Sequence, residues 1–534
     1  MNNPSIFVCR AVAFVLSFSV SFLPGFTQIQ ENLSWGGPID PLQQKVTIEH
    51  YELELEVFPE SKRIAGFLKV RFDCGQKLDT LRLNLLESYE VTRVEIYDEP
   101  VKFRHVSDTL DVFIPDGCAT AATIYYEGPT PIAKNPPWDG GFTWERDGLG
   151  NHWMGLSAQN EGAKIFMPCL DHPSSKASNG VDLFITVPAP YFVAANGRLV
   201  HQEKIGEKIA YHWSTDYPIS NYNINFTVGI FHQEQKSHRS TAGEEIPMMV
   251  YTLEENKDKA PMLLSVLETS LNTHEKYFGA FPFPNDKIAV VETPYLGMEH
   301  QTINAYGNNF QFVPMGEAYY DWLLHHELGH EWWGNKVTVG DWADYWIHEG
   351  ICTYGDWLFY LEHGGEDAYQ EKVNAVARTI PNKQPIVAPE NATSDEAYHS
   401  EVYSKGAYVI HSLRFILGDE LFFPMLRSFL ADERFTYSNL VDTGDFVAFV
   451  QQFSGRDLKG FFNMYLYTNN LPEIRVRKKG KNRYFVEIPN IDFFIPMAID
   501  TSDGIVRVEL SADPVIVESS SPITVDPEGW FLKR

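Results

Sequence analysis

The stretch Asp321–Tyr354, DWLLHHELGHEWWGNKVTVGDWADYWIHEGICTY, decides what the surrounding chain must build. It contains the pentapeptide HELGH, in which His326 and His330 stand four residues apart. On an α-helix such residues lie on one face, so two imidazoles can bind one metal ion. Glu327 follows the first histidine and can reach a water molecule on that metal. The stretch therefore predicts a helix that carries a catalytic zinc site.

Two histidines leave a catalytic zinc short of one protein ligand. Such a zinc takes three protein ligands, and two His with one Glu is an established set. Eighteen residues separate His330 from Glu349, which opens an apolar run that predicts a second helix beside the first. The rival pattern with a Gly and a third His is excluded, because Trp333 and Lys336 occupy those offsets. A buried helix with two ordinary histidines is the alternative for the pentapeptide alone.

The composition is that of a large, acidic, folded protein. The chain has 534 residues, which exceeds a single hydrophobic core and predicts two to four domains. A hydrophobic content of 44% and an aromatic content of 14% argue against disorder. The net charge of −28 makes nucleic acids and anionic membranes poor partners. Solubility explains this charge more simply than attraction of cationic substrates does.

The first 28 residues are predicted to be a signal peptide. Arg10 precedes the apolar run Ala11–Leu23, which is too short to span a bilayer comfortably, and Pro24-Gly25 ends that run. We therefore expect export to the periplasm or the extracellular space, with an uncleaved membrane anchor as the less favoured alternative. The rest of the sequence has no run of about 18 apolar residues, so we expect no membrane insertion of the mature chain.

Hydrophobic patterning divides the remaining chain into three parts. Alternation of apolar and polar residues over 45–234 predicts a mainly antiparallel β domain. Helical periodicity dominates 235–468, which includes the zinc stretch, and alternation returns over 469–534. Cys74 and Cys118 both fall in the first part and could form a disulfide, but the sequence leaves their pairing open.

Four motifs resemble those of the gluzincin zinc aminopeptidases, the family of aminopeptidase N and leukotriene hydrolase, and they occur along the chain in the order that the family has. The four are HELGHEWWGNKVT…WIHEG (326–350), LGMEH (296–300), YSKG (403–406), and Gln159 followed by MPCLDHP (167–173). The resemblance implies a multidomain α+β fold: an N-terminal antiparallel β domain, a thermolysin-like, mainly α catalytic domain and a small C-terminal β-sandwich. It also implies a short form without the C-terminal helical domain of longer members.

The resemblance implies the chemistry of the metal site. His326, His330 and Glu349 would bind one Zn²⁺ per chain. Glu327 would act on the zinc-activated water as general base and then as general acid. Tyr403, the first residue of YSKG, would stabilise the oxyanion. The reaction would be hydrolysis of the N-terminal peptide bond of a peptide substrate.

The resemblance also implies a site for the free N-terminus of the peptide. Glu299 would bind the substrate α-amino group through charge-assisted hydrogen bonds, which an internal peptide bond cannot offer. The other predicted substrate-binding residues are Gln159, Gly297, Met298 and His300. Among the departures from the family's G-A-M-E-N pattern, Leu296 replaces Gly and His300 replaces Asn. A cationic His300 beside the ammonium site would raise KM or narrow the pH range.

Other interpretations are weighed against the aminopeptidase. An endopeptidase or an epoxide hydrolase could use the same zinc site, although Glu299 argues against an endopeptidase. A catalytically silent peptide-binding protein is the non-enzymatic alternative, but every ligand and the base are present. The sequence indicates neither the preferred N-terminal residue nor the oligomeric state.

Overall fold

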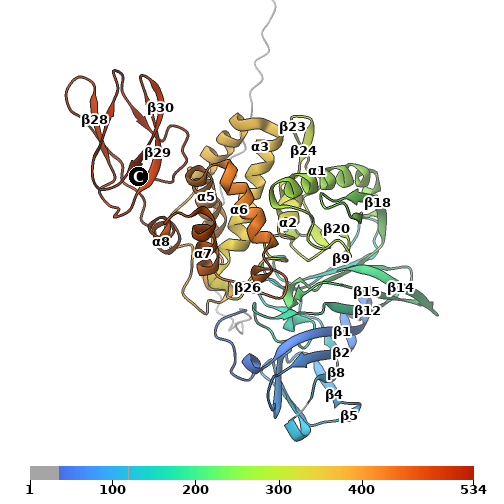
Figure 1. Cartoon of the computed structure of the whole chain (residues 1–534). Helices are drawn as coiled ribbons and strands as arrows, with labels where there is room; N and C mark the ends of the chain where they lie inside the picture. Colours follow the sequence, from blue (N-terminus) through green and yellow to red (C-terminus); the bar gives the residue numbers. More distant parts are fainter. Residues whose placement is uncertain (1–34, 118) are drawn as a thin grey trace, which may run out of the picture. The chain divides into compact units, whose positions relative to one another are not determined.

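The computed structural model of the chain describes residues 35–117 and 119–534 (Figure 1). The predicted signal peptide, residues 1–28, lies outside the described residues, as does Cys118 of the possible disulfide. The described residues belong to one compact unit. Among them, no helix is both long and apolar enough to cross a membrane.

The N-terminal part builds a large sheet from the alternating strands. In β1 (Thr47–Phe58), the side chains of Tyr51, Leu53, Leu55 and Val57 are buried, and the residues between them are at least partly exposed. This strand pairs in parallel with β12 and antiparallel with β2, and all other neighbours in the sheet are antiparallel. The strands, in sheet order, are β14 (Arg198–Ile205), β15 (Lys208–Ser214), β12 (Val181–Pro188), β1, β2 (Arg63–Asp73), β8 (Ala121–Pro129), β4 (Glu90–Ile96) and β5 (Glu99–Pro100).

A second sheet of the N-terminal part leads the chain to Gln159. Its strands, in order, are β13 (Phe192–Ala195), β17 (Phe226–Gly229), β10 (His152–Ser157) and β9 (Gly141–Arg146). The segment that follows β10 is hydrogen-bonded to residues 380–402, a segment with three prolines that precedes Tyr403. The Ser394 hydroxyl donates to the carbonyl oxygen of Asn160 at 2.9 Å. The Ser394 N–H in turn donates to the carbonyl oxygen of Trp35 at 2.7 Å. These bonds connect the two parts of the chain that flank the candidate site.

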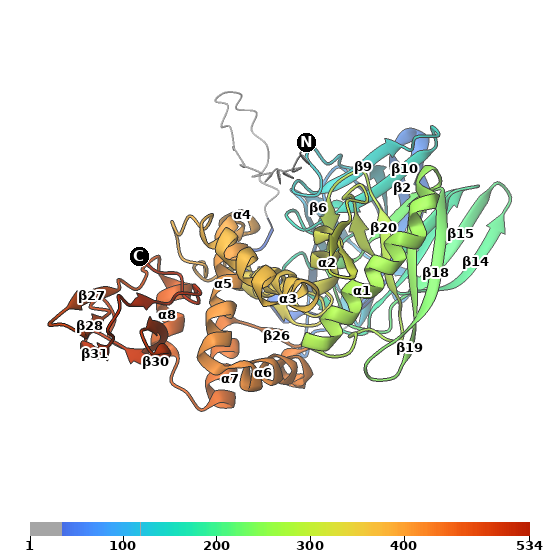
Figure 2. The ribbon, with the colours of Figure 1, turned by 90° about the horizontal axis from the view of Figure 1, so that it is seen from above.

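The middle part of the chain begins with a five-stranded sheet and continues in helices (Figure 2). The strands, in sheet order, are β18 (Phe231–Arg239), β19 (Glu245–Leu253), β20 (Ile288–Glu292), β22 (Asn304–Tyr306) and β21 (Gly297–Met298). The predicted domain boundary at residue 234 falls within β18. The main helices are α1 (Ala260–Phe278), α2 (Trp322–Gly329), α3 (Trp346–Ala377), α5 (Ser400–Leu417), α6 (Asp419–Ala431), α7 (Thr443–Ser454) and α8 (Lys459–Tyr467).

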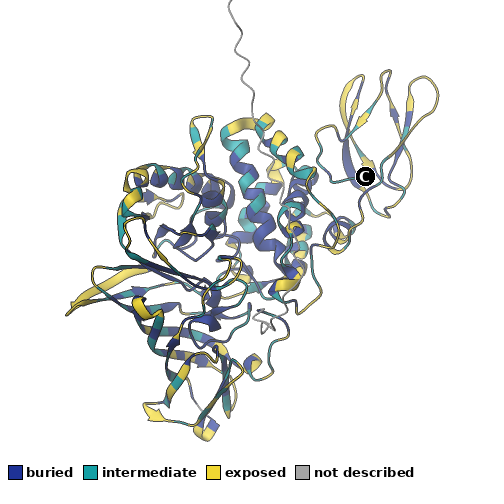
Figure 3. Ribbon diagram, turned by 180° about the vertical axis from the view of Figure 1, so that it is seen from behind, coloured by how far each residue is buried: buried dark blue, intermediate teal, exposed yellow. Residues whose placement is uncertain are grey.

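Apolar residues at helical spacing predict a helix over 406–417, but α5 begins six residues earlier, at Ser400. Apolar periodicity does not predict the first turns of α5, because the buried side chains there include the polar residues Glu401 and Lys405. Glu401 accepts a hydrogen bond from the Lys383 N–H at 3.0 Å, and the Lys405 ammonium donates to the carbonyl oxygen of Thr468 at 2.9 Å. The buried faces of α3 and α5 appear dark blue in Figure 3.

The C-terminal part consists of two three-stranded sheets. One sheet contains β27 (Arg475–Lys478), β28 (Arg483–Glu487) and β31 (Val515–Glu518), and the other contains β30 (Gly504–Leu510), β29 (Ile495–Thr501) and β32 (Thr524–Val525). The predicted fold class is therefore confirmed: a mainly antiparallel β part, a mainly α part and a small β part follow one another along the chain.

Candidate metal centre and active site

Helix α2 carries the first two predicted metal ligands. Asp321 caps its N-terminus, since the Asp321 carboxylate accepts a hydrogen bond from a backbone N–H of the first turn. His326 lies inside the helix, and His330 directly follows its last residue with helical backbone angles of φ −64° and ψ −18°. The two imidazoles consequently lie one turn apart on the same face, with ring centroids separated by 4.9 Å.

The helix ends earlier than the sequence predicts. Glycine and asparagine commonly end helices, so the sequence predicts a stop at Gly334-Asn335, whereas α2 ends at Gly329. Beyond this point the chain forms a wide turn in which backbone N–H groups donate to carbonyl oxygens five residues back, for example from Asn335 to His330 at 2.9 Å. This turn brings the carbonyl oxygen of Trp333 to 2.9 Å from His330 Nδ1. Because α2 ends early, the carbonyl oxygen of Trp333 can accept a hydrogen bond from His330, the second predicted ligand.

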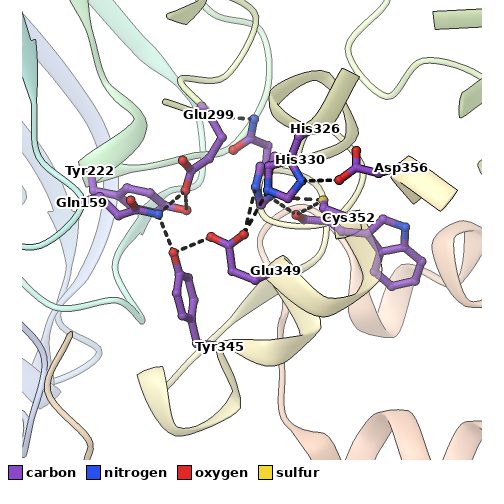
Figure 4. Close-up of polar contacts among 11 residues, drawn as sticks. Gln159, Tyr222, Glu299, His326, His330, Tyr345, Glu349, Cys352 and Asp356 are labelled. Carbon is purple, nitrogen blue, oxygen red and sulfur yellow. Dashed lines mark hydrogen bonds and ion pairs between the residues drawn. The ribbon is translucent and has the colours of Figure 1, made fainter. Parts of the chain in front are cut away.

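The third predicted ligand approaches from α3. Glu349 lies in the first turn of that helix, and its Oε2 atom is 3.2 Å from His326 Nε2 and 3.5 Å from His330 Nε2. Ligand atoms of a tetrahedral zinc site with bonds of about 2.0–2.1 Å lie about 3.3 Å apart. The three atoms therefore have the identity and the spacing that a zinc ion requires (Figure 4).

Both histidines present their Nε2 atoms because acceptors occupy Nδ1. His326 Nδ1 donates to Asp356 Oδ2 at 3.0 Å, and His330 Nδ1 donates to the carbonyl oxygen of Trp333. The Cys352 sulfur lies 3.3 Å from the same His330 nitrogen. A proton on Nδ1 leaves the lone pair on Nε2, which is the form that binds a metal.

The surroundings of the three ligands stabilise positive charge. Burial by itself lowers the pKa of His326, but Asp356 and Glu349 outweigh burial and hold this pKa well above its ordinary value. For His330, Cys352 and Glu349 likewise outweigh burial, and its pKa is also raised well above the ordinary value. Burial raises the pKa of Glu349, yet the two histidines reverse that effect and leave it well below its usual range. A bound cation would supply the positive charge that this site favours.

Glu327, the predicted base, lies beside the metal ligands on the same helix. It is 7% exposed, and burial raises its pKa to about 8. Gly297 makes room for it, since a Cβ atom at this glycine would lie 2.5 Å from Glu327 Oε1. The glycine of the LGMEH motif therefore has a steric role next to the predicted base.

Glu299 adds a second carboxylate close to the metal ligands. It follows strand β21 and is 3% exposed, and burial raises its pKa above the ordinary value. One potential ligand atom from each of Glu299, Glu327 and His330 lies within 4.8 Å of the others. The Gln159 amide donates to Glu299 Oε1 at 2.8 Å, and the Tyr222 hydroxyl donates to the same oxygen at 3.4 Å (Figure 4). The structure thus brings Gln159 of the N-terminal part to the buried carboxylate of Glu299.

Tyr403 lies in the first turn of α5, next to the first histidine. Its ring centroid is 6.3 Å from that of His326 and 6.0 Å from that of Tyr398. Burial, followed by the negative charge of Glu349, raises the pKa of Tyr403 well above its ordinary value. The hydroxyl therefore stays protonated at neutral pH and can donate a hydrogen bond.

Residues 263–465 match the Peptidase family M1 domain, and residues 47–223 match the Peptidase M1 N-terminal domain. The chain belongs to peptidase family M1. The resemblance to the gluzincin aminopeptidases is thereby confirmed, and zinc is the metal that the family and the donor set of this chain indicate.

Curated M1 relatives are distant and longer than this chain. Aminopeptidase M1-D of Oryza sativa subsp. japonica is 25% identical over 374 residues, which cover 66% of this chain and 41% of the relative. Leucyl aminopeptidase of Saccharolobus solfataricus is 22% identical over 403 residues, which cover 69% of this chain and 49% of the relative. The chain thus spans between two fifths and one half of the length of these relatives.

Two solved structures share the fold. A mutant M1 zinc metallopeptidase from Deinococcus radiodurans, bound to a Tyr-Ser-Ala substrate, aligns with a TM-score of 0.67 and 22% identity. That alignment covers 80% of this chain and 96% of the neighbour. Legionella pneumophila aminopeptidase A in complex with aspartic acid aligns with a TM-score of 0.74 and 17% identity, covering 92% of this chain and 59% of the neighbour. At these identities, the alignments establish the shared M1 architecture.

His300, which departs from the M1 motif, is buried between the N-terminal and middle parts of the chain. Its side chain is 1% exposed, and burial lowers its pKa to about 3, so the imidazole is neutral near pH 7. Its Nε2 accepts a hydrogen bond from the Asn225 amide of the N-terminal part at 3.0 Å. A neutral His300 places no positive charge next to Glu299. Met298 is also 1% exposed, and Leu296 is partly exposed.

Sequence analysis did not single out Tyr222, Tyr345 or Asp356. Asp356 stands seven residues after Glu349, which is two helical turns and therefore the same face of α3, so its position could have been found. No local signal points to Tyr222. Tyr345 ends the turn before α3 and borders a narrow pocket. The lining of this pocket consists of Gln159, Asn160, Trp342, Tyr345, Ser394, Ala397 and Tyr398.

Proposed function

We propose that the chain is a zinc aminopeptidase that hydrolyses the N-terminal peptide bond of peptides. The observation that carries this proposal is the buried carboxylate of Glu299 beside Glu327 and His330. A buried carboxylate is costly without a partner, and the α-ammonium of a peptide is a suitable one. An internal peptide bond has no ammonium at that place, so an endopeptidase would leave Glu299 without its counter-charge.

In this proposal His326, His330 and Glu349 hold the zinc. When bound, zinc polarises the scissile carbonyl and lowers the pKa of water toward 7. Glu327 takes the proton from the attacking water and later gives it to the leaving amine. Burial raises the pKa of Glu327 to about 8 and a nearby cation lowers it, so this carboxyl can accept and release a proton near neutral pH.

Two further side chains act on the substrate. The protonated Tyr403 hydroxyl donates a hydrogen bond to the oxygen on which negative charge develops. Its place beside His326 supports this role. Gln159, with Glu299, positions the substrate amine, and Gly297 keeps space for the base.

The comparisons support the aminopeptidase proposal at the level of names. The curated relatives are called aminopeptidases, and the Deinococcus radiodurans neighbour is described with a Tyr-Ser-Ala substrate. We further propose export through the predicted signal peptide, residues 1–28, and the predicted boundaries 45–234, 235–468 and 469–534 for the three domains. Peptides with a free N-terminus are the proposed partners.

The test is hydrolysis of a panel of aminoacyl arylamides and their N-acetylated counterparts, with zinc quantified and Glu327→Gln as the inactive control. Cleavage of the free-amine substrates alone, abolished in the variant, is the expected result. Equal cleavage of acetylated substrates would contradict the role of Glu299 and indicate an endopeptidase. Absence of any cleavage by the zinc-loaded protein would refute the proposed activity.

A further inference from the structure

Tyr345 lies between the metal ligands and the predicted amine site. It directly precedes α3, and its side chain is 3% exposed. Its hydroxyl donates to Glu349 Oε1 at 2.6 Å and accepts a hydrogen bond from the Gln159 amide at 2.5 Å (Figure 4). The same amide nitrogen donates to Glu299 Oε1. A continuous series of hydrogen bonds therefore joins Glu349, Tyr345, Gln159 and Glu299.

The direction of every hydrogen bond in this series follows from its two ends. A carboxylate that ligates a metal is ionised and can only accept, so the Tyr345 hydroxyl must donate to Glu349. With its proton used there, the hydroxyl accepts from Gln159. The second amide proton of Gln159 goes to Glu299. Both N–H bonds of the amide are then used, and its carbonyl oxygen is left to accept from a donor such as an ammonium.

The bond from Tyr345 also assigns different tasks to the two oxygens of Glu349. Oε1 accepts from the Tyr345 hydroxyl, whereas Oε2 faces the Nε2 atoms of His326 and His330. Tyr345 and Glu349 are four residues apart at the start of α3, so both side chains lie on one face of the helix. This arrangement holds the carboxylate with one oxygen toward the metal position.

We propose that Tyr345 is a positioning residue that orients Glu349 for the metal and Gln159 for the substrate amine. The second task rests on the proposed aminopeptidase function, whereas the first concerns metal binding alone. Without the Tyr345 hydroxyl, Glu349 is free to rotate. The Gln159 amide loses the acceptor that fixes its orientation, and a flipped amide would present N–H groups to an ammonium.

A purely structural role for Tyr345 makes a different prediction. Its ring lies 4.7 Å from that of Trp342 and 6.3 Å from that of Tyr398, so it contributes to aromatic packing. Tyr345→Phe keeps the ring and deletes only the hydroxyl. If packing were its whole contribution, this variant would bind zinc and substrate as the wild type does.

The experiment compares the wild type with Tyr345→Phe, Gln159→Met and Tyr360→Phe. Tyr360 lies further along α3 and outside this series of hydrogen bonds, so Tyr360→Phe is the matched control. Its zinc affinity, kcat and KM should equal those of the wild type. Zinc affinity is measured by competition with a chelator, and kcat and KM are measured with the arylamide that the wild type cleaves best. Tyr345→Phe should weaken zinc binding by about ten- to a hundredfold, as loss of a metal ligand's hydrogen-bond partner does. It should also raise KM by about tenfold. Gln159→Met should raise KM alone.

Zinc affinity and KM of Tyr345→Phe within twofold of the wild type would overturn the proposal. So would equal losses in Tyr360→Phe, or equal weakening of zinc binding in Gln159→Met. If Tyr345→Phe does not fold, an unchanged KM in Gln159→Met still refutes the second task. If the wild type cleaves nothing, the proposed function fails, while the zinc competition continues to test the first task.

Discussion

Glu299→Gln provides the sharpest test of the exopeptidase assignment. The substitution keeps the size of the side chain and an oxygen that can accept from the Gln159 amide, which lies 2.8 Å from Glu299 Oε1. It removes the negative charge that would pair with the substrate ammonium. Because the carboxylate is 3% exposed, water cannot replace the lost partner efficiently.

The size of the effect follows from the strength of a hydrogen bond to a charged group. Such a bond contributes about 1.5–3 kcal/mol, which corresponds to a fall in kcat/KM of about 10- to 150-fold. The α-ammonium keeps its charge from the bound substrate to the transition state, so its contact with Glu299 is equally strong in both. Loss of uniform binding raises KM and leaves kcat nearly unchanged. The variant should therefore show its defect in KM.

The assay measures kcat and KM with a free-amine arylamide and its N-acetylated form. Glu292→Gln is the matched control, because Glu292 is also a buried carboxylate, at the end of β20, but accepts its hydrogen bonds from Leu253 and Asn256. This control should retain the wild-type KM. A fall in kcat/KM of less than threefold for Glu299→Gln, or a fall that appears only in kcat, would refute the assignment of Glu299 to the ammonium.

Three further predictions concern other contacts of the site. Asp356→Asn, which replaces the carboxylate that holds His326 Nδ1, should weaken zinc binding by about ten- to a hundredfold in a chelator competition; unchanged affinity would contradict this role. Burial raises the pKa of Asp344 to about 6, so the native state loses stability as pH rises from about 4 through 6. In Asp344→Asn, the free energy of unfolding should fall by up to about 3 kcal/mol less between pH 4 and pH 7 than in the wild type. Denaturant unfolding of the zinc-free proteins at the two pH values measures this difference. An equal fall in both proteins would refute the prediction. Gly406→Ala should lower the free energy of unfolding by about 1–3 kcal/mol and reduce kcat, because its Cβ would lie 2.9 Å from the Gly350 Cα. Wild-type values of both quantities would contradict a close contact between α3 and α5 at these glycines.

The cluster of His326, His330 and Glu349 could be predicted because its geometry is mostly local. His326 and His330 are one helical turn apart in any α-helix, and Glu349 lies in the first turn of the next long helix. The fold class could likewise be predicted, since alternation in strands such as β1 follows directly from burial of one face. These features depend on periodicity that a single sequence contains.

The remaining parts of the site depend on contacts between distant segments. Gln159 and Glu299 are 140 residues apart, and nothing near either residue indicates their hydrogen bond. The neutral state of His300 depends on its burial against Asn225, which residue type alone does not reveal. The early end of α2 depends on a wide turn, which places the carbonyl oxygen of Trp333 within hydrogen-bond distance of His330 Nδ1. In each case the deciding contact is tertiary, so local patterns could not indicate it.

The crossing of α3 and α5 gives a physical reason for two glycines in the motifs. Gly350 follows the ligand Glu349, and Gly406 comes one turn after Tyr403. A Cβ atom on either glycine would lie 2.9 Å from the Cα of the other, closer than real side chains approach backbone. Any larger residue must push the two helices apart. Since α3 carries Glu349 and α5 carries Tyr403, such a shift would move the tyrosine hydroxyl away from the metal position. The close crossing therefore sets the distance between a metal ligand and the proposed oxyanion donor.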